Sequence, residues 1–224
     1  MNFKALLLSL RLAGTVSIIL SAVAIPLAYG LAFSKWRGKF LLESVVALPL
    51  VLPPTVLGFY ALIVLGPRGA IGKVAQSVLG HPLAFTFTGL VIASLFYSLP
   101  FAVQPLMNSF ESLDPRLFAA SAVLGASPLR TLLKIILPLS WPGLLSSLVL
   151  SFAHTLGEFG VVLMVGGNLP GITRTASIDI YDRVQAMDYA GAHAMSLLLL
   201  AISFVVLAVV YAVNRRAWSP WHSQ

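Results

Sequence analysis

The chain has 224 residues, of which 58% are hydrophobic and only 9% are charged, and its mean hydropathy is +0.95. Soluble domains carry about 25% charged residues, so this composition excludes an ordinary soluble domain and predicts an integral membrane protein. The net charge of +7 then indicates cytoplasmic loops and not a nucleic-acid partner, and the lack of cysteine excludes disulfides, a thiolate nucleophile and cysteine metal sites.

Five apolar segments are long enough to cross a bilayer, which takes about twenty residues. They cover residues 12–33 (with helix extending back to Phe3), 41–65, 83–110, 139–165 and 191–213. No clear cleavage site follows the first segment, so we expect a retained helix and not a signal peptide. The expected fold is an all-α membrane protein, a single domain over residues 1–224. It would have five transmembrane helices, or six if residues 3–11 cross partly by themselves.

Prolines interrupt two of these segments. Residues 48–54 read LPLVLPP, and these prolines remove backbone hydrogen bonds that a helix needs. A break inside a bilayer is tolerated only where neighbouring helices or a water-lined cavity satisfy the freed carbonyls. We therefore expect Pro53 and Pro54 to face the bundle interior, either as hinges beside a pore or as packing kinks. Pro100 and Pro105 leave the same two alternatives open.

Lysine and arginine residues predict the orientation of the segments, because cytoplasmic loops are enriched in them close to the membrane. One side would hold Lys35, Arg37, Lys39, Arg116, Arg130, Lys134, Arg215 and Arg216. The other side would hold Lys4, Arg11, Arg68, Lys73, Arg174 and Arg183. The first group is larger and adjoins the membrane ends more closely. We therefore expect residues 111–138 and the C-terminus in the cytoplasm and the N-terminus outside.

Residues 111–138, ESLDPRLFAASAVLGASPLRTLLKIILP, differ from both apolar neighbours. An Asp-Pro pair at 114–115 supplies an N-cap and a favourable first helical residue. Gly125 would end this helix in the left-handed conformation, and a Ser-Pro pair at 127–128 would start a second helix. The first helix is too short to span a bilayer. The pattern thus predicts a helical elbow on the membrane surface, built to contact another protein.

Residues 66–74, GPRGAIGKV, imitate a phosphate-binding loop without meeting its requirements. Pro67 stands where the first glycine is needed, Val74 replaces the hydroxyl residue that binds magnesium, and no strand precedes the loop. We therefore expect no ATP site in this chain.

Glu158 is the only acidic residue well inside a predicted span, and His154 lies four residues before it on the same helical face. An acid in the membrane is costly and points to a function, here a gate or a proton relay. The alternative is a buried pair, or a carboxylate satisfied by helix-end amides near Gly157 and Gly160. His154, His193 and one glutamate are too few to predict a metal site. No Ser-His-Asp set has a water-exposed position, so catalysis is not expected.

The elbow resembles the cytoplasmic signature of binding-protein-dependent ABC importer permeases. That signature reads Glu-Ala-Ala, three residues, Gly, nine residues, Ile-x-Leu-Pro. The chain matches it with 119–121, Gly125 and 135–138 at the same spacing. Ala119 stands at the glutamate position and Ser121 at the second alanine, which removes any salt bridge of that glutamate.

Three further stretches resemble the molybdate permease subfamily: LPLVLPPTVLGFY at 48–60, HTLGEFG at 154–160 and NLPGITRTASIDIY at 168–181. The resemblance implies a homodimer in the bacterial inner membrane, with two cytoplasmic ABC ATPase subunits and an extracytoplasmic molybdate-binding protein. It implies molybdate as substrate and tungstate as a close analogue. Sulfate permeases share much of the pattern, so a sulfate-type permease stays open. ATP and magnesium would bind the ATPase, which leaves this chain without a cofactor or an enzymatic activity.

The resemblance also assigns roles to residues. The coupling elbow would comprise Leu117, Phe118, Ala119, Ala120, Ser121, Leu124, Gly125, Ala126, Pro128 and Pro138, with Leu117, Phe118 and Leu124 docking on the ATPase. Candidate pore or gate residues are Pro53, Pro54, Thr55, Ser151, Thr155, Gly157, Glu158 and Gly160. The hydroxyls of Thr55, Ser151 and Thr155 suit a dianion better than Glu158 does, because like charges repel.

Two readings remain for the polar loop at 166–190 and for the chain as a whole. Arg174 and the loop aspartates form either a solvated outer face or a contact for the binding protein. The chain is either an ABC permease or an ion-coupled transporter in which Glu158 and His154 relay protons. The lack of an inverted repeat and of further deep acids argues against the second. Nothing in the sequence favours a scaffold that transports nothing.

Overall fold

The computed structural model describes residues 2–34 and 36–218, with side chains described as far as residue 212. The described part is built of helices, and no strand occurs in it. The expected cytoplasmic cations Lys35, Arg215 and Arg216 have side chains outside this description.

The helices run in chain order as α1 Phe3–Phe33, α2 Lys39–Val51, α3 Pro54–Leu65, α4 Ala70–Leu79, α5 Phe87–Glu111, α6 Pro115–Val123, α7 Pro128–Thr131, a π-helical turn Leu132–Ile136, α8 Leu137–Leu139, α9 Trp141–Gly157, α10 Gly160–Gly166, α11 Ala176–Gln185 and α12 Tyr189–Trp218. Within the described residues, α1, α5 and α12 are long and apolar enough to cross a membrane unbroken. Two bent pairs, α2 with α3 and α7–α8 with α9, raise the number to five if each crosses once. The all-α membrane fold is thus confirmed. Residues 3–11 are part of α1, so they form no sixth helix.

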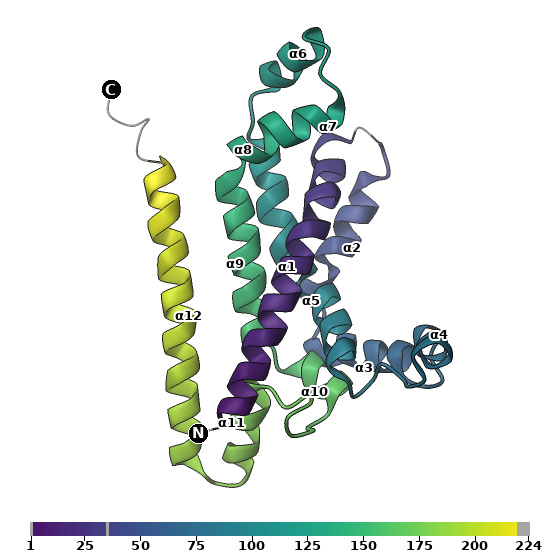
Figure 1. Ribbon diagram of the computed structural model, residues 1–224, viewed down its shortest axis with the longest axis vertical. Coiled ribbons are helices and arrows are strands. Elements are labelled where there is room, and N and C mark those ends of the chain that lie inside the picture. Colours follow the sequence, from purple (N-terminus) through teal and green to yellow (C-terminus); the bar gives the residue numbers. More distant parts are fainter. Residues whose placement is uncertain (1, 35, 219–224) are drawn as a thin grey trace.

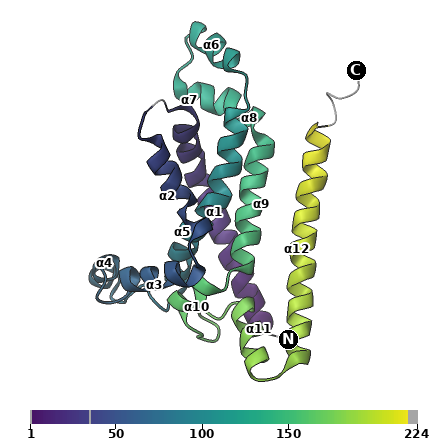
Figure 2. The same ribbon diagram turned by 180° about the vertical axis from the view of Figure 1, so that it is seen from behind.

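The core lies where α1, α5 and α9 pack together. Its fully buried side chains include Leu12, Val16, Leu106 and Phe110. The helix α12 stands apart: only 11% of its apolar window is buried, against 50% for α5. It packs against α11 and α9, and its described buried side chains are Ala192, Met195 and Val210. Figure 1 and Figure 2 show it along one side of the bundle. An apolar helix this exposed is suited to a lipid or protein environment and not to water.

The break between α2 and α3 is sharper than a kink, because the two helices meet at 111°. Leu52 and Pro53 each precede a proline, which disfavours helical backbone for both of them. Both residues are accordingly extended, with ψ of 139° and 137°. Pro54 then starts α3, where its missing N–H is not needed.

Two segments between the expected spans contain helices. The Gly-rich stretch 66–82 holds α4, which ends at Gly80 in the left-handed conformation. The polar stretch 166–190 holds α11, whose N-cap Thr175 accepts a hydrogen bond from the Ile178 amide. Each helix has ten residues and carries polar side chains. A pattern this short, with turn residues at both ends, is difficult to distinguish from a loop in the sequence.

The elbow and the end of α12 lie at one end of the molecule, and the N-terminus and α11 lie at the other (Figure 1). Among the described residues, Lys39, Arg116, Arg130 and Lys134 belong to segments at the elbow end, and Lys4, Arg174 and Arg183 to segments at the other end. Which end faces the cytoplasm stays a prediction. Lys39 at the elbow end bridges Glu43 at 3.2 Å and Glu111 at 3.4 Å, which links the start of α2 to the end of α5.

The contact between α5 and α9 gives a first prediction. A methyl group added at buried Gly143 would lie 2.3 Å from Ser109 Cβ and 3.2 Å from the Pro105 carbonyl oxygen. We expect Gly143→Ala to destabilise the protein by about 1–3 kcal/mol through overpacking. Exposed Gly30 has nothing within 4 Å of an added methyl group, so Gly30→Ala serves as the control and should not lower stability. Thermal unfolding in detergent measures both, and equal melting temperatures for the two variants would contradict the prediction.

Candidate functional site

The two interrupted helices meet each other at the site. An added Cβ at Gly160 would lie 2.7 Å from Pro54 Cβ, and one at Gly58 would lie 2.7 Å from Met164 Cβ. The helices α3 and α10 therefore approach as closely as backbone allows, through glycines on both sides. This contact places the start of α3 beside the break between α9 and α10.

A cavity of about 600 Å³ opens beside this contact. Of the predicted pore residues it is lined by Pro54, Thr55, Gly157, Glu158 and Gly160. Pro53 precedes this lining at the end of the α2–α3 break, where it is exposed. The structure thus brings most of the predicted set to one place, while their role as a pore or gate stays a prediction.

Ser151 and Thr155 lie elsewhere, on the buried face of α9. Ser151 Oγ donates to the Ser147 carbonyl oxygen of its own helix at 2.7 Å. Thr155 Oγ1 lies 2.9 Å from Ser98 Oγ, which joins α9 to α5. Neither residue lines the cavity: the Ser151 hydroxyl bonds within α9, and the Thr155 hydroxyl joins α9 to α5.

Glu158 lies at the break itself, as the C-cap of α9 with extended backbone. Only 5% of the residue is exposed, and neither carboxyl oxygen has a hydrogen-bond partner among the described residues. No histidine and no helix-end amide of the described residues bonds the carboxylate in this conformation, and the Ser94 side chain of α5 is a polar neighbour outside hydrogen-bond geometry. A buried carboxyl without partners is costly, which favours a role at the cavity over a structural one.

His154 belongs to an aromatic cluster and does not pair with Glu158. Its ring stacks on Phe101 at 3.9 Å between centroids and lies 4.7 Å from Tyr97. Its Nδ1 is 2.9 Å from Ser98 Oγ. Tyr97 and Phe101 are one helical turn apart on α5. This cluster could not be predicted, because no local pattern in the sequence pairs α5 with α9.

The chemistry available at the cavity is mostly neutral. Exposed Thr55 contributes a hydroxyl to its lining, and Tyr97 and His154 also line it. In the first turn of α3 the amides of Val56 and Leu57 already donate to the Pro53 carbonyl, so Thr55 supplies the remaining amide there. Glu158 is the one acidic residue among the lining side chains of the described chain, and no lysine or arginine is among them. No group of three metal-ligating side chains occurs in the described residues. The site can therefore offer hydrogen bonds to a small polar solute, with few fixed charges.

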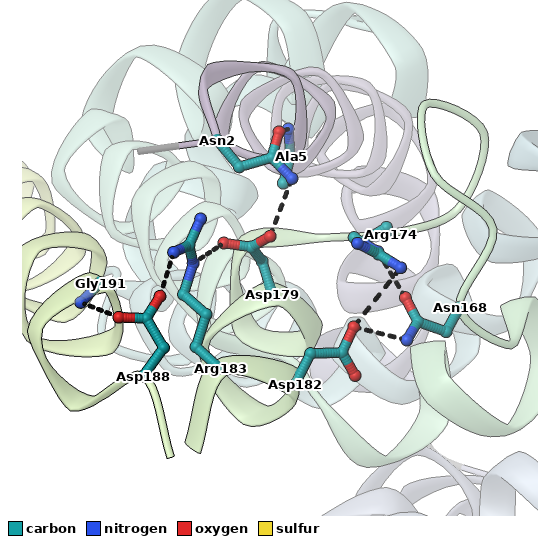
Figure 3. A network of polar contacts seen from close by, with 9 residues as sticks. All are labelled: Asn2, Ala5, Asn168, Arg174, Asp179, Asp182, Arg183, Asp188 and Gly191. Carbon is teal, nitrogen blue, oxygen red and sulfur yellow. Dashed lines mark hydrogen bonds and ion pairs between the residues drawn. The ribbon is translucent and has the colours of Figure 1, made fainter. Parts of the chain in front are cut away.

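A polar network ties together the end of the molecule opposite the elbow (Figure 3). Arg183 bridges Asp179 at 2.9 Å and Asp188 at 2.7 Å, and Asn2 donates to Asp179 at 2.8 Å. Hydrogen bonds from the Gly191 amide and from Arg183 lower the pKa of Asp188, so this carboxylate stays ionised at neutral pH. The network holds the N-terminus, α11 and the start of α12 as one unit.

Arg174, the candidate contact for a binding protein, takes part in a second cluster. Its Nε donates to Asn168 Oδ1 at 2.6 Å, and its guanidinium lies 3.5 Å from Asp182. Asn168 donates in turn to Asp182 at 2.6 Å. Arg174 is thus already paired and about one quarter exposed, so contact with a partner protein stays a prediction.

The elbow has the predicted caps and joint. Asp114 accepts from the Arg116 amide at 2.8 Å, and Ser127 accepts from the Arg130 amide at 3.3 Å. Gly125 has φ of 72°, and the Ala126 amide closes the joint by donating to the Ser121 carbonyl at 3.0 Å. The second helix runs past Pro138 to Leu139, because the π-helical turn before it bonds Leu137 N–H to the Leu132 carbonyl.

Side chains of the elbow separate into two faces. Leu117 is 38% and Leu124 is 85% exposed, whereas Phe118 turns inward and meets Phe33 edge-on at 5.0 Å. Phe118 is half-buried against the bundle, so its part in docking on a partner stays a prediction. Val123, 88% exposed, extends the outer apolar face in its place. Ala119 is exposed on this helix, at the position where the family signature has glutamate.

Ser121 stands where the family signature has its second alanine, and its side chain has a structural role. It is buried, and its Oγ donates to the Phe118 carbonyl at 2.9 Å and lies 3.1 Å from Thr131 Oγ1. It thereby fastens the first elbow helix to the second.

Comparisons with known proteins fit this geometry. Residues 24–219 match the family model described as the inner membrane component of binding-protein-dependent transport systems. The molybdenum transport system permease protein ModB of Azotobacter vinelandii is 48% identical over 96% of this chain and 95% of its own length. The protein of the same name from Escherichia coli K12 is 35% identical, covering 93% and 91%. A probable sulfate transport system permease protein of Chlorella vulgaris is 33% identical, covering 93% and 78%.

Solved structures share the fold. A bacterial ABC transporter that imports the acidic polysaccharide alginate superposes with a TM-score of 0.77 at 18% identity, over 96% of this chain and 79% of the other. The broken helices, the surface elbow and the apolar bundle thus define a membrane-embedded transport permease. The chain belongs to the family of binding-protein-dependent transport system inner membrane components.

The joint of the elbow gives a second prediction. Valine at position 125 would be forced into the left-handed region, at a cost of about 1–2 kcal/mol, although no atom lies within 4 Å of its added Cβ. We expect Gly125→Val to lower uptake strongly while the protein still reaches the membrane. Asparagine tolerates positive φ, so Gly125→Asn should keep most of the activity. Normal uptake by the valine variant would show that the joint need not be rigid.

The buried carboxyl gives a third prediction. Because Glu158 has no hydrogen-bond partner among the described residues, Glu158→Gln removes an ionisable group without removing a bond. We expect its melting temperature in detergent at neutral pH to equal or exceed that of the natural protein. A clear drop would mean that the carboxylate makes a stabilising contact.

Proposed function

We propose that this chain is the membrane-spanning subunit of an ATP-driven importer for molybdate. It would act as a homodimer with two cytoplasmic ABC ATPase subunits and receive the oxyanion from an extracytoplasmic binding protein. The observation that carries the proposal is the capped, glycine-jointed elbow at the family spacing. Relatives named as molybdenum permeases match nearly the whole chain and support the choice of anion.

The elbow would sit in the cytoplasm and dock in a groove of the ATPase. Leu117, Val123 and Leu124 supply an exposed apolar face for that contact. Burying each side chain would contribute about 1.5–3 kcal/mol. Since Ala119 offers no charge at the signature position, shape and apolar contact would dominate the docking.

The path from elbow to cavity is short and stiff. The second elbow helix joins α9 at a 76° bend, and α9 continues unbroken from Trp141 to Gly157. At about 1.5 Å per residue it spans roughly 25 Å, and its far end carries the break at Glu158. A displacement of the elbow by closing ATPases would therefore move one wall of the cavity.

The cavity suits the transient passage of a dianion. The hydroxyl and the amide of Thr55 would donate hydrogen bonds to tetrahedral oxygens, since the next two amides of α3 already donate to the Pro53 carbonyl. An ionised Glu158 would oppose the dianion, since unit like charges about 4 Å apart repel by about 4 kcal/mol at an effective dielectric constant of 20. A transport path needs weak binding, so a cavity lining that binds the oxyanion only weakly suits an importer.

The fourth prediction tests this function in proteoliposomes that contain the chain and its ATPase. Molybdate-loaded binding protein should raise ATP hydrolysis several-fold and drive uptake, whereas sulfate-loaded protein should do so much less. Unchanged hydrolysis with molybdate but stimulation with sulfate would move the assignment to a sulfate-type permease. Uptake driven by a proton gradient without the ATPase would support the ion-coupled alternative.

A further inference from the structure

Another cavity, of about 630 Å³, lies at the far end of α3 from the two breaks. Its lining is apolar apart from backbone and one guanidinium, and consists of Leu62, Ile63, Gly66, Pro67, Arg68, Ala84 and Phe85. In Figure 1 and Figure 2, α3 and α4 extend sideways from the bundle, on the side away from α12 and nearer to α11 than to the elbow. This cavity therefore belongs to a part of the chain that faces the surroundings of the bundle.

Backbone contacts fix the walls of this cavity. The Ala84 amide donates to the Leu65 carbonyl oxygen at 3.3 Å, and the Phe85 amide donates to the Val165 carbonyl oxygen at 2.9 Å. Phe85 has φ of 64°, a conformation that an aromatic residue rarely adopts. Strain of this kind persists only where the surrounding structure enforces it. The half-exposed ring of Phe85 is therefore held in place at the cavity.

The cations of this part of the molecule have no acidic partner. Arg68 and Lys73 are exposed, and neither forms an ion pair within the described residues. Residues 44–110 contain no aspartate or glutamate, so no acid close in the sequence can supply one. The turn that carries Arg68 is tight, because the Gly69 amide donates to the Gly66 carbonyl oxygen at 2.9 Å. Two uncompensated positive charges thus lie on a well-defined backbone.

The helix α4, which follows this turn, has an apolar face that is exposed. Ile71, Val74 and Val78 follow one another at helical spacing and are 48%, 64% and 75% exposed. Lys73 and Gln76 lie on the opposite side of the helix. A helix with this division lies in the interface of a bilayer, with its apolar face toward the acyl chains and its lysine among the headgroups.

A lipid and a second copy of this chain are the two occupants to compare for such a surface, and charge separates them. A two-fold axis through this surface would place the same segment of another copy against it, which adds the same cations and no acid. An anionic phospholipid instead supplies the opposite charge for Arg68 and acyl chains for the apolar lining. Arginine binds phosphate through paired hydrogen bonds, and basic pockets beside membrane helices bind anionic headgroups.

We infer that residues 62–85 form a binding site for an anionic phospholipid. Arg68 binds the headgroup phosphate, an acyl chain runs over Ile63 and Phe85, and the apolar face of α4 lies in the same leaflet beside it. The site needs only a membrane, so it does not depend on the proposed function. Because α3 begins beside Thr55 in the cavity at the breaks and ends at this site, the lipid would hold the far end of a helix that lines that cavity.

The first test measures which lipids the full-length protein retains in detergent. The protein is supplied with equal amounts of phosphatidylglycerol, which is anionic, and phosphatidylcholine, which is zwitterionic, and bound lipid is identified by native mass spectrometry after washing. The natural protein should retain phosphatidylglycerol several-fold better, and Arg68→Gln should abolish this preference. Arg68→Lys keeps the charge without the paired hydrogen bonds and should give an intermediate value. Arg116→Gln, which removes an exposed arginine of the elbow, is the matched control and should keep the preference.

The second test distinguishes lipid from a second copy on α4. The chain contains no cysteine, so a single cysteine at position 74 or 76 can carry an environment-sensitive fluorophore. In liposomes of phosphatidylglycerol with brominated acyl chains, the label at position 74 should be quenched several-fold more strongly than the label at position 76 on the opposite face.

Retained preference in Arg68→Gln, or an equal loss in Arg116→Gln, would overturn the site, because the lipid would then be attracted by surface cations in general. Absence of quenching at position 74, together with a disulfide between two copies of Val74→Cys, would assign the exposed face of α4 to a second copy of the chain.

Discussion

The architecture depends on how closely two interrupted helices pack against each other at their breaks inside an apolar bundle. A helix that breaks in a bilayer leaves backbone groups without partners, and only protein or a lined cavity can receive them. The break after α2 and the break after α9 lie beside each other, so each is covered by protein. Gly160 lies against Pro54, and Gly58 lies against Met164, so that α3 and α10 pack at backbone distance. Side chains larger than glycine at these two positions would separate the breaks and open the bundle.

This contact gives the cavity its position and its polarity. The start of α3 brings Thr55, and the end of α9 brings Glu158. One long helix, α9, joins this place to the elbow, and a hydrogen bond from Ser177 joins it to α11. The cavity thus lies where elements from both ends of the molecule meet. That arrangement agrees with a permease that must respond to partners on two sides of a membrane.

Capping residues, a glycine and prolines, read from the sequence alone, were sufficient to predict the elbow and the α2–α3 break. Asp114, Gly125 and Ser127 act within a few residues of themselves, and consecutive prolines fix the backbone before them, so neighbours alone predict these features. The pairing of α5 with α9 could not be predicted in the same way. Ser98 with His154, Ser177 with Glu158, and Phe118 with Phe33 are long-range contacts whose partners depend on the packing of whole helices. Glu158 shows the limit most clearly: its position in a span was evident, but its lack of partners was not.

The claim that the cavity at the two breaks lies on the route of the oxyanion can be measured directly. A single cysteine at position 55, in the reconstituted complex with its ATPase and binding protein, reports on access to the cavity through its rate of reaction with a small maleimide. The account predicts that millimolar molybdate slows this reaction during ATP turnover, while the reaction of a cysteine at exposed Val78 on α4 is unaffected. Uptake of molybdate with no protection at position 55 would place the route elsewhere in the protein.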